Sequence, residues 1–175
     1  MHDTKVKPSE EIERHTLTVL VDNEAGVLAR VVGLFSGRGY NIESLTVAEV
    51  DPITRTSRIT IVTSGTPAVI DQIETQLRRL VPTHKVTNWT GQKAGIEREM
   101  ALIKVAGIGD KRVEALRMAD AFRARPVDTT HSSFVFEITG APSKIDSFVD
   151  LMRPLGLVEV SRTGVAAISR GPEPM

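Results

Sequence analysis

Two halves of the chain show the same succession of hydrophobic patterns, and this repetition restricts the fold more than any other feature of the sequence. Each half begins with apolar residues at alternate positions, which is typical of a strand, followed by an apolar stripe with helical spacing. Two more strand patterns, a second helical stripe and a last strand pattern complete each half. The chain therefore encodes the order β-α-β-β-α-β twice.

This order predicts an α+β protein of two ferredoxin-like βαββαβ units, each with two helices on one face of a four-stranded antiparallel sheet. The expected strands lie at 15–21, 41–50, 57–63 and 84–89, and then at 99–106, 126–131, 133–139 and 157–168, with Gly164 as a candidate bend in the last. The expected helices begin at Val27 and Pro67, cover 111–124, and follow Pro142, with Thr66 as an N-cap. Residues 90–98 form the predicted linker between domains at 13–91 and 97–171.

Units of this size leave much of their surface uncovered. With about 75 residues each, burial of apolar surface is marginal. One sheet face and the edge strands also remain to be covered. Pairing with a second copy is the simplest solution, so we expect a homodimer. The alternative is a monomer in which the two units cover each other.

Charge and composition exclude several functions. The 22 Lys and Arg residues balance 22 Asp and Glu residues, so the positive surplus that attracts nucleic acids and anionic membranes is missing. No apolar run approaches the roughly 20 residues of a membrane helix. The absence of cysteine excludes disulfides, thiolate metal sites and a cysteine nucleophile, and is compatible with a cytoplasmic protein.

Motifs of a catalyst are also missing from the sequence. It contains no Walker loop and no nucleophile elbow, and its four histidines are not spaced as metal ligands. Gly107 and Gly109 resemble the start of a dinucleotide-binding loop, but the third glycine is absent, which favours a plain turn. We therefore predict no catalytic residue and no metal site.

One loop has the chemistry of a small-ligand site. Asn23 and Gly26 lie between the first strand and the first helix, whose N-terminal N–H groups favour a carboxylate. Asn41 opens the next strand, and both asparagines offer a donor and an acceptor. A zwitterionic amino acid needs these groups and an apolar wall, for which Val27, Leu28 or Ile42 are candidates. On chemistry alone a plain turn remains the alternative, because Asn and Gly are common in turns.

The same segment carries a resemblance to a known family. Residues 22–51, DNEAGVLARVVGLFSGRGYNIESLTVAEVD, resemble the ligand-binding signature of ACT domains, in particular that of the regulatory small subunit of acetolactate synthase (acetohydroxyacid synthase). The similarity continues through SRITIVTSG, IEREMALIKVAG and VSRTGVAAISRG, and covers residues 15–171.

The resemblance implies an N-terminal ACT domain, a C-terminal ferredoxin-like domain and a homodimer. Members of this family are not catalysts. They bind and stimulate a separate catalytic subunit, which would carry thiamine diphosphate, Mg and FAD, and they confer feedback inhibition, usually by valine bound between two ACT domains. The resemblance assigns valine contacts to Asn23, Gly26, Val27 and Leu28 of one chain and to Asn41 and Ile42 of its partner.

Two other functions are weighed against this one. A stand-alone amino-acid-sensing ACT regulator would need an element that reads DNA, and no basic recognition helix is apparent in this neutral chain. A catalyst in its own right would need the motifs that are missing. Binding to the thiamine-dependent catalytic chain distinguishes all three.

Overall fold

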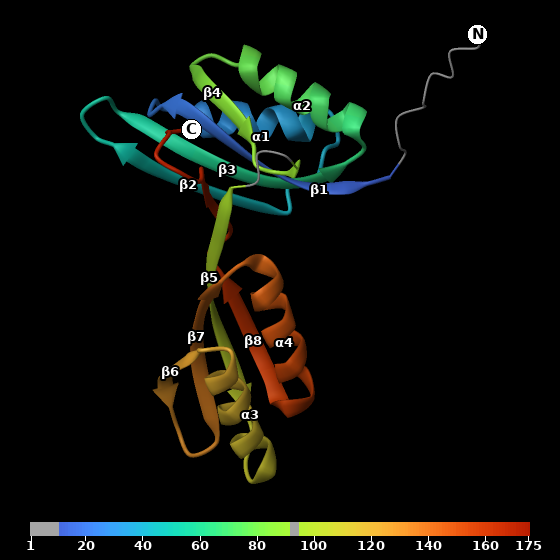
Figure 1. The fold of residues 1–175 in the computed structure, drawn as a ribbon, viewed down its shortest axis with the longest axis vertical. Coiled ribbons are helices and arrows are strands. Elements are labelled where there is room, and N and C mark those ends of the chain that lie inside the picture. Colours follow the sequence, from blue (N-terminus) through green and yellow to red (C-terminus); the bar gives the residue numbers. More distant parts are fainter. Residues whose placement is uncertain (1–10, 92–94) are drawn as a thin grey trace. The chain divides into compact units, whose positions relative to one another are not determined.

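The computed structural model describes residues 11–91 and 95–175 and divides into two compact units (Figure 1). The first unit consists of Met1–Ile96 together with Ala167–Met175, and the second is Glu97–Ala166. The C-terminal segment from Ala167 is therefore part of the first unit, whereas the sequence assigned residues up to 171 to the second.

The first unit is a four-stranded antiparallel sheet of strand order β2-β3-β1-β4 with two helices on one face (Figure 1). Its elements are β1 (Glu13–Asp22), α1 (Val27–Gly37), β2 (Ser44–Asp51), β3 (Thr56–Gly65), α2 (Pro67–Arg79) and β4 (Thr83–Asn88). This confirms the predicted ferredoxin-like arrangement, because the two central strands β1 and β3 each begin one half of the split unit.

The core of the first unit follows from the alternation in its strands. Side chains at alternate positions of β1, such as Leu17 and Val19, are fully buried with Val31 and Phe35 of α1 in one apolar cluster. The helix α2 begins as predicted, since the Thr66 hydroxyl accepts the first-turn N–H of Val69 at 3.4 Å and Pro67 follows it.

The opposite face of this sheet is polar yet buried. Thr18 and Thr60 are 0% and 3% exposed, their hydroxyl oxygens lie 3.3 Å apart, and the Trp89 indole N–H donates to Thr18 at 2.7 Å. Arg58 donates to the carbonyl of Ala167 in the C-terminal segment at 2.9 Å. The first unit thus covers part of the sheet face that the sequence left open, using its own Trp89 and C-terminal residues.

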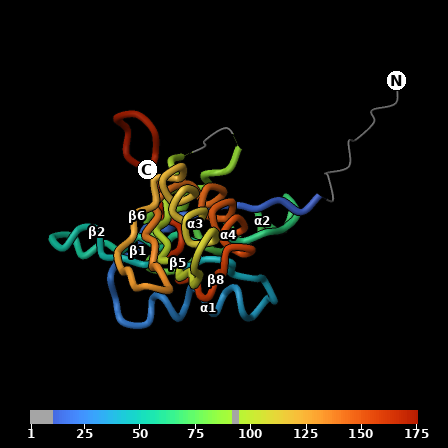
Figure 2. The backbone as a smooth tube through the Cα atoms, turned by 90° about the horizontal axis from the view of Figure 1, so that it is seen from below, coloured from blue at the N-terminus to red at the C-terminus, as the bar shows by residue number. Residues whose placement is uncertain are grey.

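The second unit repeats the arrangement with strand order β6-β7-β5-β8, and β9 pairs additionally with β5. Its elements are β5 (Ile96–Ala106), α3 (Asp110–Ala121), β6 (Arg125–Thr129), β7 (Ser133–Gly140), α4 (Pro142–Gly156) and β8 (Leu157–Arg162), whereas β9 (Ala166–Ile168) crosses into the C-terminal segment of the first unit. The helices α3 and α4 lie side by side (Figures 1 and 2). Phe136 and Phe148 are fully buried between sheet and helices and meet edge to face.

Three predicted boundaries differ from the structure by three residues, and one predicted strand is interrupted. The second strand begins at Ser44, because the carbonyl of Asn41 instead accepts the Thr63 hydroxyl at 2.6 Å. The strand β5 already begins at Ile96, inside the predicted linker. The helix α3 ends at Ala121, before Arg123 adopts a φ of 57°. The last predicted strand is broken into β8 and β9 around Gly164, whose φ is 86°.

Candidate functional site

The loop between β1 and α1 ends at a glycine that the backbone requires. Gly26 is the N-cap of α1 with a φ of 83°, in the left-handed region that favours glycine. No side chain caps this helix, and a Cβ built on Gly26 meets nothing within 4 Å. The predicted position therefore borders open space, as a site for an external ligand requires.

The first turn of α1 presents unused donors. The N–H of Val27 donates to the carbonyl of Glu24 at 3.3 Å, but the N–H groups of Leu28 and Ala29 find no acceptor among residues 11–91 and 95–175. The first turn also contains no acidic side chain. This helix end can therefore accept a carboxylate from outside the chain.

Of the predicted apolar contacts, only some are accessible in the single chain. The Val27 side chain is 5% exposed and belongs to the core, so it cannot line the open side of the loop. Leu28 is 39% exposed, and Ile42 packs against the core while remaining half-exposed. Leu28 and Ile42 are therefore the side chains that can meet an aliphatic ligand.

Asn23 is held by the hairpin that joins β2 to β3. Its main-chain N–H donates to the carbonyl of Arg55 at 2.7 Å, and its side-chain Nδ2 donates to Glu49 Oε1 at 3.1 Å. The Arg55 guanidinium donates in turn to the carbonyl of Asn23 at 3.4 Å. Three hydrogen bonds thus attach the predicted ligand loop to one hairpin.

The hairpin turn is stabilised by its own side chains. Asp51 Oδ1 accepts the main-chain N–H groups of Ile53 at 2.9 Å and Thr54 at 3.3 Å. A hydrogen bond from the Thr54 side chain, together with these main-chain donors, lowers the pKa of Asp51 below its ordinary value. The turn is therefore ordered around an ionised carboxylate at neutral pH.

The structure does not bring the two predicted groups of residues together within one chain. Asn23 follows Asp22, which pairs with Thr56 at the start of β3, whereas the Asn41 carbonyl accepts the hydroxyl of Thr63 near the end of β3. Thr56 and Thr63 are seven residues apart, which at roughly 3.3 Å per residue is about 23 Å along β3. Asn23 and Asn41 therefore lie near opposite ends of this strand. Asn41 is exposed.

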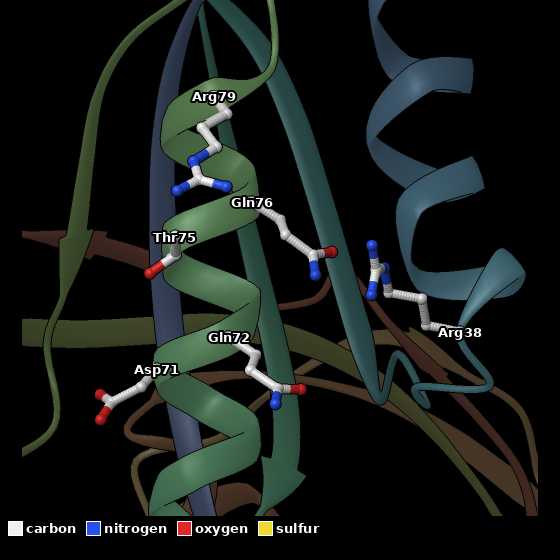
Figure 3. Close-up of a pocket in the computed structure, with 6 residues that line it drawn as sticks. All are labelled: Arg38, Asp71, Gln72, Thr75, Gln76 and Arg79. Atoms are coloured by element: carbon white, nitrogen blue, oxygen red, sulfur yellow. The ribbon is translucent and has the colours of Figure 1, made fainter.

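A surface cavity of about 400 Å³ in the first unit involves none of the six predicted site residues. It is lined from α2 by Asp71, Gln72, Thr75, Gln76 and Arg79, and by Arg38 just after α1 (Figure 3). Its lining is polar throughout. The cavity therefore lacks the apolar wall that a branched-chain amino acid needs.

Metal and membrane features are also absent from the described parts of the chain. Residues 11–91 and 95–175 contain no group of three or more His, Cys, Asp or Glu side chains that could hold a metal ion. No helix in these ranges is long and apolar enough to cross a membrane. Two of the four histidines form hydrogen bonds with other side chains, His15 with Asn88 and His84 with Asp22.

Glu49 and Arg55 were not among the site residues predicted from the sequence. Both lie close to the β2–β3 turn, and the antiparallel pairing of β1 with β3 brings this turn to the end of β1. That pairing was predictable, so the hairpin could have been recognised as a neighbour of Asn23. The individual hydrogen bonds were not predictable.

Two family descriptions match the chain. Residues 17–85 match an "AHAS small subunit-like ACT domain", and residues 98–171 match "Small subunit of acetolactate synthase". The two matched segments lie on either side of residue 96, where the first compact unit passes into the second.

Whole-chain relatives agree with these matches. The chain is 47% identical over 160 residues to a probable acetolactate synthase small subunit from Archaeoglobus fulgidus, covering 90% of this chain and 98% of the relative. It is 46% identical over 159 residues to the acetolactate synthase isozyme 3 small subunit of Escherichia coli, covering 90% and 96%. The crystal structure of the acetolactate synthase small subunit from Thermotoga maritima superposes with a TM-score of 0.80 at 38% identity, covering 92% and 99%. The chain therefore belongs to the family of acetolactate synthase small subunits.

Proposed function

We propose that this chain is a regulatory subunit that binds and activates the thiamine-diphosphate-dependent catalytic chain of acetolactate synthase, and makes it sensitive to feedback inhibition by valine. Membership of the small-subunit family supports the partner. In this proposal the catalytic chain carries thiamine diphosphate, Mg and FAD, and the complex works in the cytoplasm.

The observation that carries the effector site is the uncapped start of α1 at Gly26. The carboxylate of an amino acid would accept the free N–H groups of Leu28 and Ala29. The Asn23 amide would meet the ammonium, and the exposed Leu28 side chain would contact the aliphatic group. This set of partners matches a zwitterion with an apolar side chain.

The separation of Asn41 and Ile42 from this loop supports a homodimer. In a two-fold dimer each residue pair occurs twice, so Asn23 of one chain beside Asn41 of the other gives two equivalent sites. The strand β2 lies at the sheet edge with Val47 and Val50 42% and 51% exposed, and pairing through this edge would cover it.

A ligand shared by two chains couples binding to assembly. Valine that contacts both chains favours the dimer arrangement in which both contacts are made, and this difference in binding free energy is the basis of an allosteric effect. The wall contributed by Leu28 and Ile42 distinguishes valine from leucine or isoleucine only weakly, because one methylene is worth roughly 1–3 kcal/mol.

Calorimetric titration with valine, leucine and isoleucine tests the effector, and co-purification with the catalytic chain tests the partner. We expect valine to bind at one site per chain, the catalytic chain to be retained, and valine to reduce the acetolactate formation that this chain stimulates. A chain that binds valine but neither retains nor stimulates the catalytic chain would instead be a stand-alone amino-acid sensor. A chain that does neither contradicts the proposal.

A further inference from the structure

The β2–β3 hairpin contributes a carboxylate to the candidate effector loop. Glu49, in the edge strand β2, accepts the Asn23 Nδ2 donor at 3.1 Å. The hairpin projects beyond the neighbouring strands of the first sheet (Figure 1). Glu49 thus stands at the same end of β1 as the uncapped start of α1.

An ionised carboxylate can only accept hydrogen bonds, and this has a consequence for Asn23. An asparagine amide carries one acceptor oxygen and one NH₂ donor group, and a neutral environment leaves its orientation undetermined. Because Glu49 takes the donor side, the Asn23 oxygen is turned away from the hairpin. The amide then offers an acceptor to the solvent side of the loop, where the ammonium of an amino acid would bind.

The main chain of Asn23 is fixed by the same hairpin. Its N–H donates to the carbonyl of Arg55 at 2.7 Å, and Arg55 holds an unusual φ of 51°. The Asp51 contacts to Ile53 and Thr54 stabilise the turn that imposes this conformation. The position of Asn23 and the orientation of its amide are therefore both set before a ligand arrives.

We infer that Glu49 is a positioning residue that orients the Asn23 amide and thereby makes the site selective for an α-amino acid over the keto acid with the same side chain. This inference rests on the proposed function, because it concerns the same effector. A site that offers a hydrogen-bond acceptor to an ammonium discriminates strongly against a ligand that lacks one.

The test is calorimetric titration of the full-length chain with valine and with its keto acid, 3-methyl-2-oxobutanoate. Glu49→Gln keeps the size of the side chain but can donate as well as accept, so the Asn23 amide is free to turn. We expect roughly tenfold weaker valine binding, from the loss of a hydrogen bond to a charged group, and keto-acid affinity changed by less than about twofold. Glu114→Gln, at a glutamate of α3 in the second unit whose side chain is 42% exposed, is the matched control.

A double-mutant cycle separates positioning from direct attraction. In an Asn23→Asp background no amide remains to be oriented, so Glu49→Gln should no longer weaken valine binding. A loss in both backgrounds would show that the Glu49 charge acts directly on the ligand and would overturn the positioning role. Unchanged valine affinity of Glu49→Gln, or an equal loss for the keto acid, would overturn the inference too. A wild-type chain that does not bind valine would instead contradict the proposed function itself.

Discussion

The two units share one loop design and differ in how the following helix begins. Both α1 and α3 are capped by a glycine with positive φ, Gly26 at 83° and Gly109 at 61°, and neither has a side-chain cap. The first turn of α3 contains Asp110, whereas the first turn of α1 has no acidic residue. The second unit therefore supplies its own negative charge to the helix end, and the first leaves that place to a ligand.

This difference shows that the repeated fold and the ligand site are separate properties. Both loops need a glycine because φ is positive at each N-cap, although ψ differs, at −2° for Gly26 and −136° for Gly109. Only the surrounding side chains, such as Asn23 and its partner Glu49, distinguish the loop with a candidate ligand role. A repeated fold can thus keep a site in one copy alone.

The units also differ in the polar groups that they bury. The first buries neutral groups, with Trp89 donating to Thr18. The second buries the carboxylate of Glu99, whose side chain is 3% exposed and pairs with Arg162, which also contacts Asp146 at 2.6 Å. Burial by itself lowers the pKa of Arg162, but the hydrogen bonds and negative charges of Glu99 and Asp146 together outweigh burial and raise this pKa above its ordinary value.

The largest expected effect comes from removing the partner of the buried Glu99 carboxylate, the Arg162 side chain, which is itself 36% exposed. Arg162→Met leaves Glu99 buried without its partner and should destabilise the second unit by about 3 kcal/mol. Trp89→Phe, which removes one neutral hydrogen bond from the first unit, should cost about 1 kcal/mol. Urea unfolding followed by circular dichroism measures both variants. Fluorescence of the single tryptophan follows the first unit only in chains that keep Trp89, such as the wild type and Arg162→Met.

A double variant serves as the control for the ion pair. Arg162→Met combined with Glu99→Leu removes both charges and should recover most of the lost stability. If Arg162→Met alone unfolds at the wild-type urea concentration, the buried pair does not stabilise the second unit and the contrast between the units is wrong.

The next effect concerns ligand binding and uses the paired glycines. Gly26→Asp places a carboxylate beside the N–H groups of Leu28 and Ala29 and should weaken valine binding by about a hundredfold, because one charge-assisted contact is lost and a like charge is added. Gly109→Asp makes the same change in the second unit and should leave valine affinity unaltered. A Cβ at either position meets no atom within 4 Å, but φ is positive at both. Gly26→Asp, in the left-handed region, should cost roughly 1 kcal/mol of stability, and Gly109→Asp, whose ψ of −136° lies outside that region, should cost about 1–3 kcal/mol. Calorimetric titration that finds equal valine affinity in the two variants would place the ligand elsewhere.

The smallest expected effect makes α1 resemble α3. Ala29→Glu puts an acidic side chain in the exposed first turn of α1 and should stabilise the first unit by about 0.5 kcal/mol through the helix dipole. The same carboxylate competes with that of the ligand, so valine affinity should fall severalfold. Thermal unfolding and titration of one preparation check both results, and a gain in stability with no loss of affinity would contradict the proposed position of the ligand carboxylate.

Much of the fold could be predicted from periodicity. The helix starts at Val27 and Pro67 and the four-stranded order of each unit follow from apolar spacing and turn residues. The predicted strand over 157–168 is interrupted at the expected bend at Gly164, where a φ of 86° divides it into β8 and β9. The ends of helices and strands were harder to predict, because they depend on single hydrogen bonds between residues distant in sequence. The bond from the Thr63 hydroxyl to the Asn41 carbonyl is an example.

The candidate site could be predicted only in part. Gly26 and Asn23 could be predicted because the conformational freedom of glycine and the donor and acceptor of an asparagine amide follow from residue type alone. Val27 was expected as an apolar contact, but its side chain belongs to the core. Which side of a helix faces the core depends on how the helix packs against the sheet. Glu49 gave no local signal, because its partner Asn23 lies 26 residues away in the sequence.

By itself, the sequence determined the doubled βαββαβ order, the glycine that begins α1 and the absence of cysteine chemistry, because each of these follows from spacing or residue type alone. The tertiary structure decided which side chains meet. It placed the β2–β3 hairpin against Asn23 and the C-terminal residue Ala167 against Arg58 of the first sheet. It also placed Asn23 near the start of β3, beside Thr56, and Asn41 near its end, beside Thr63. These juxtapositions depend on strand pairing between distant segments, whose register is fixed only when the whole sheet assembles.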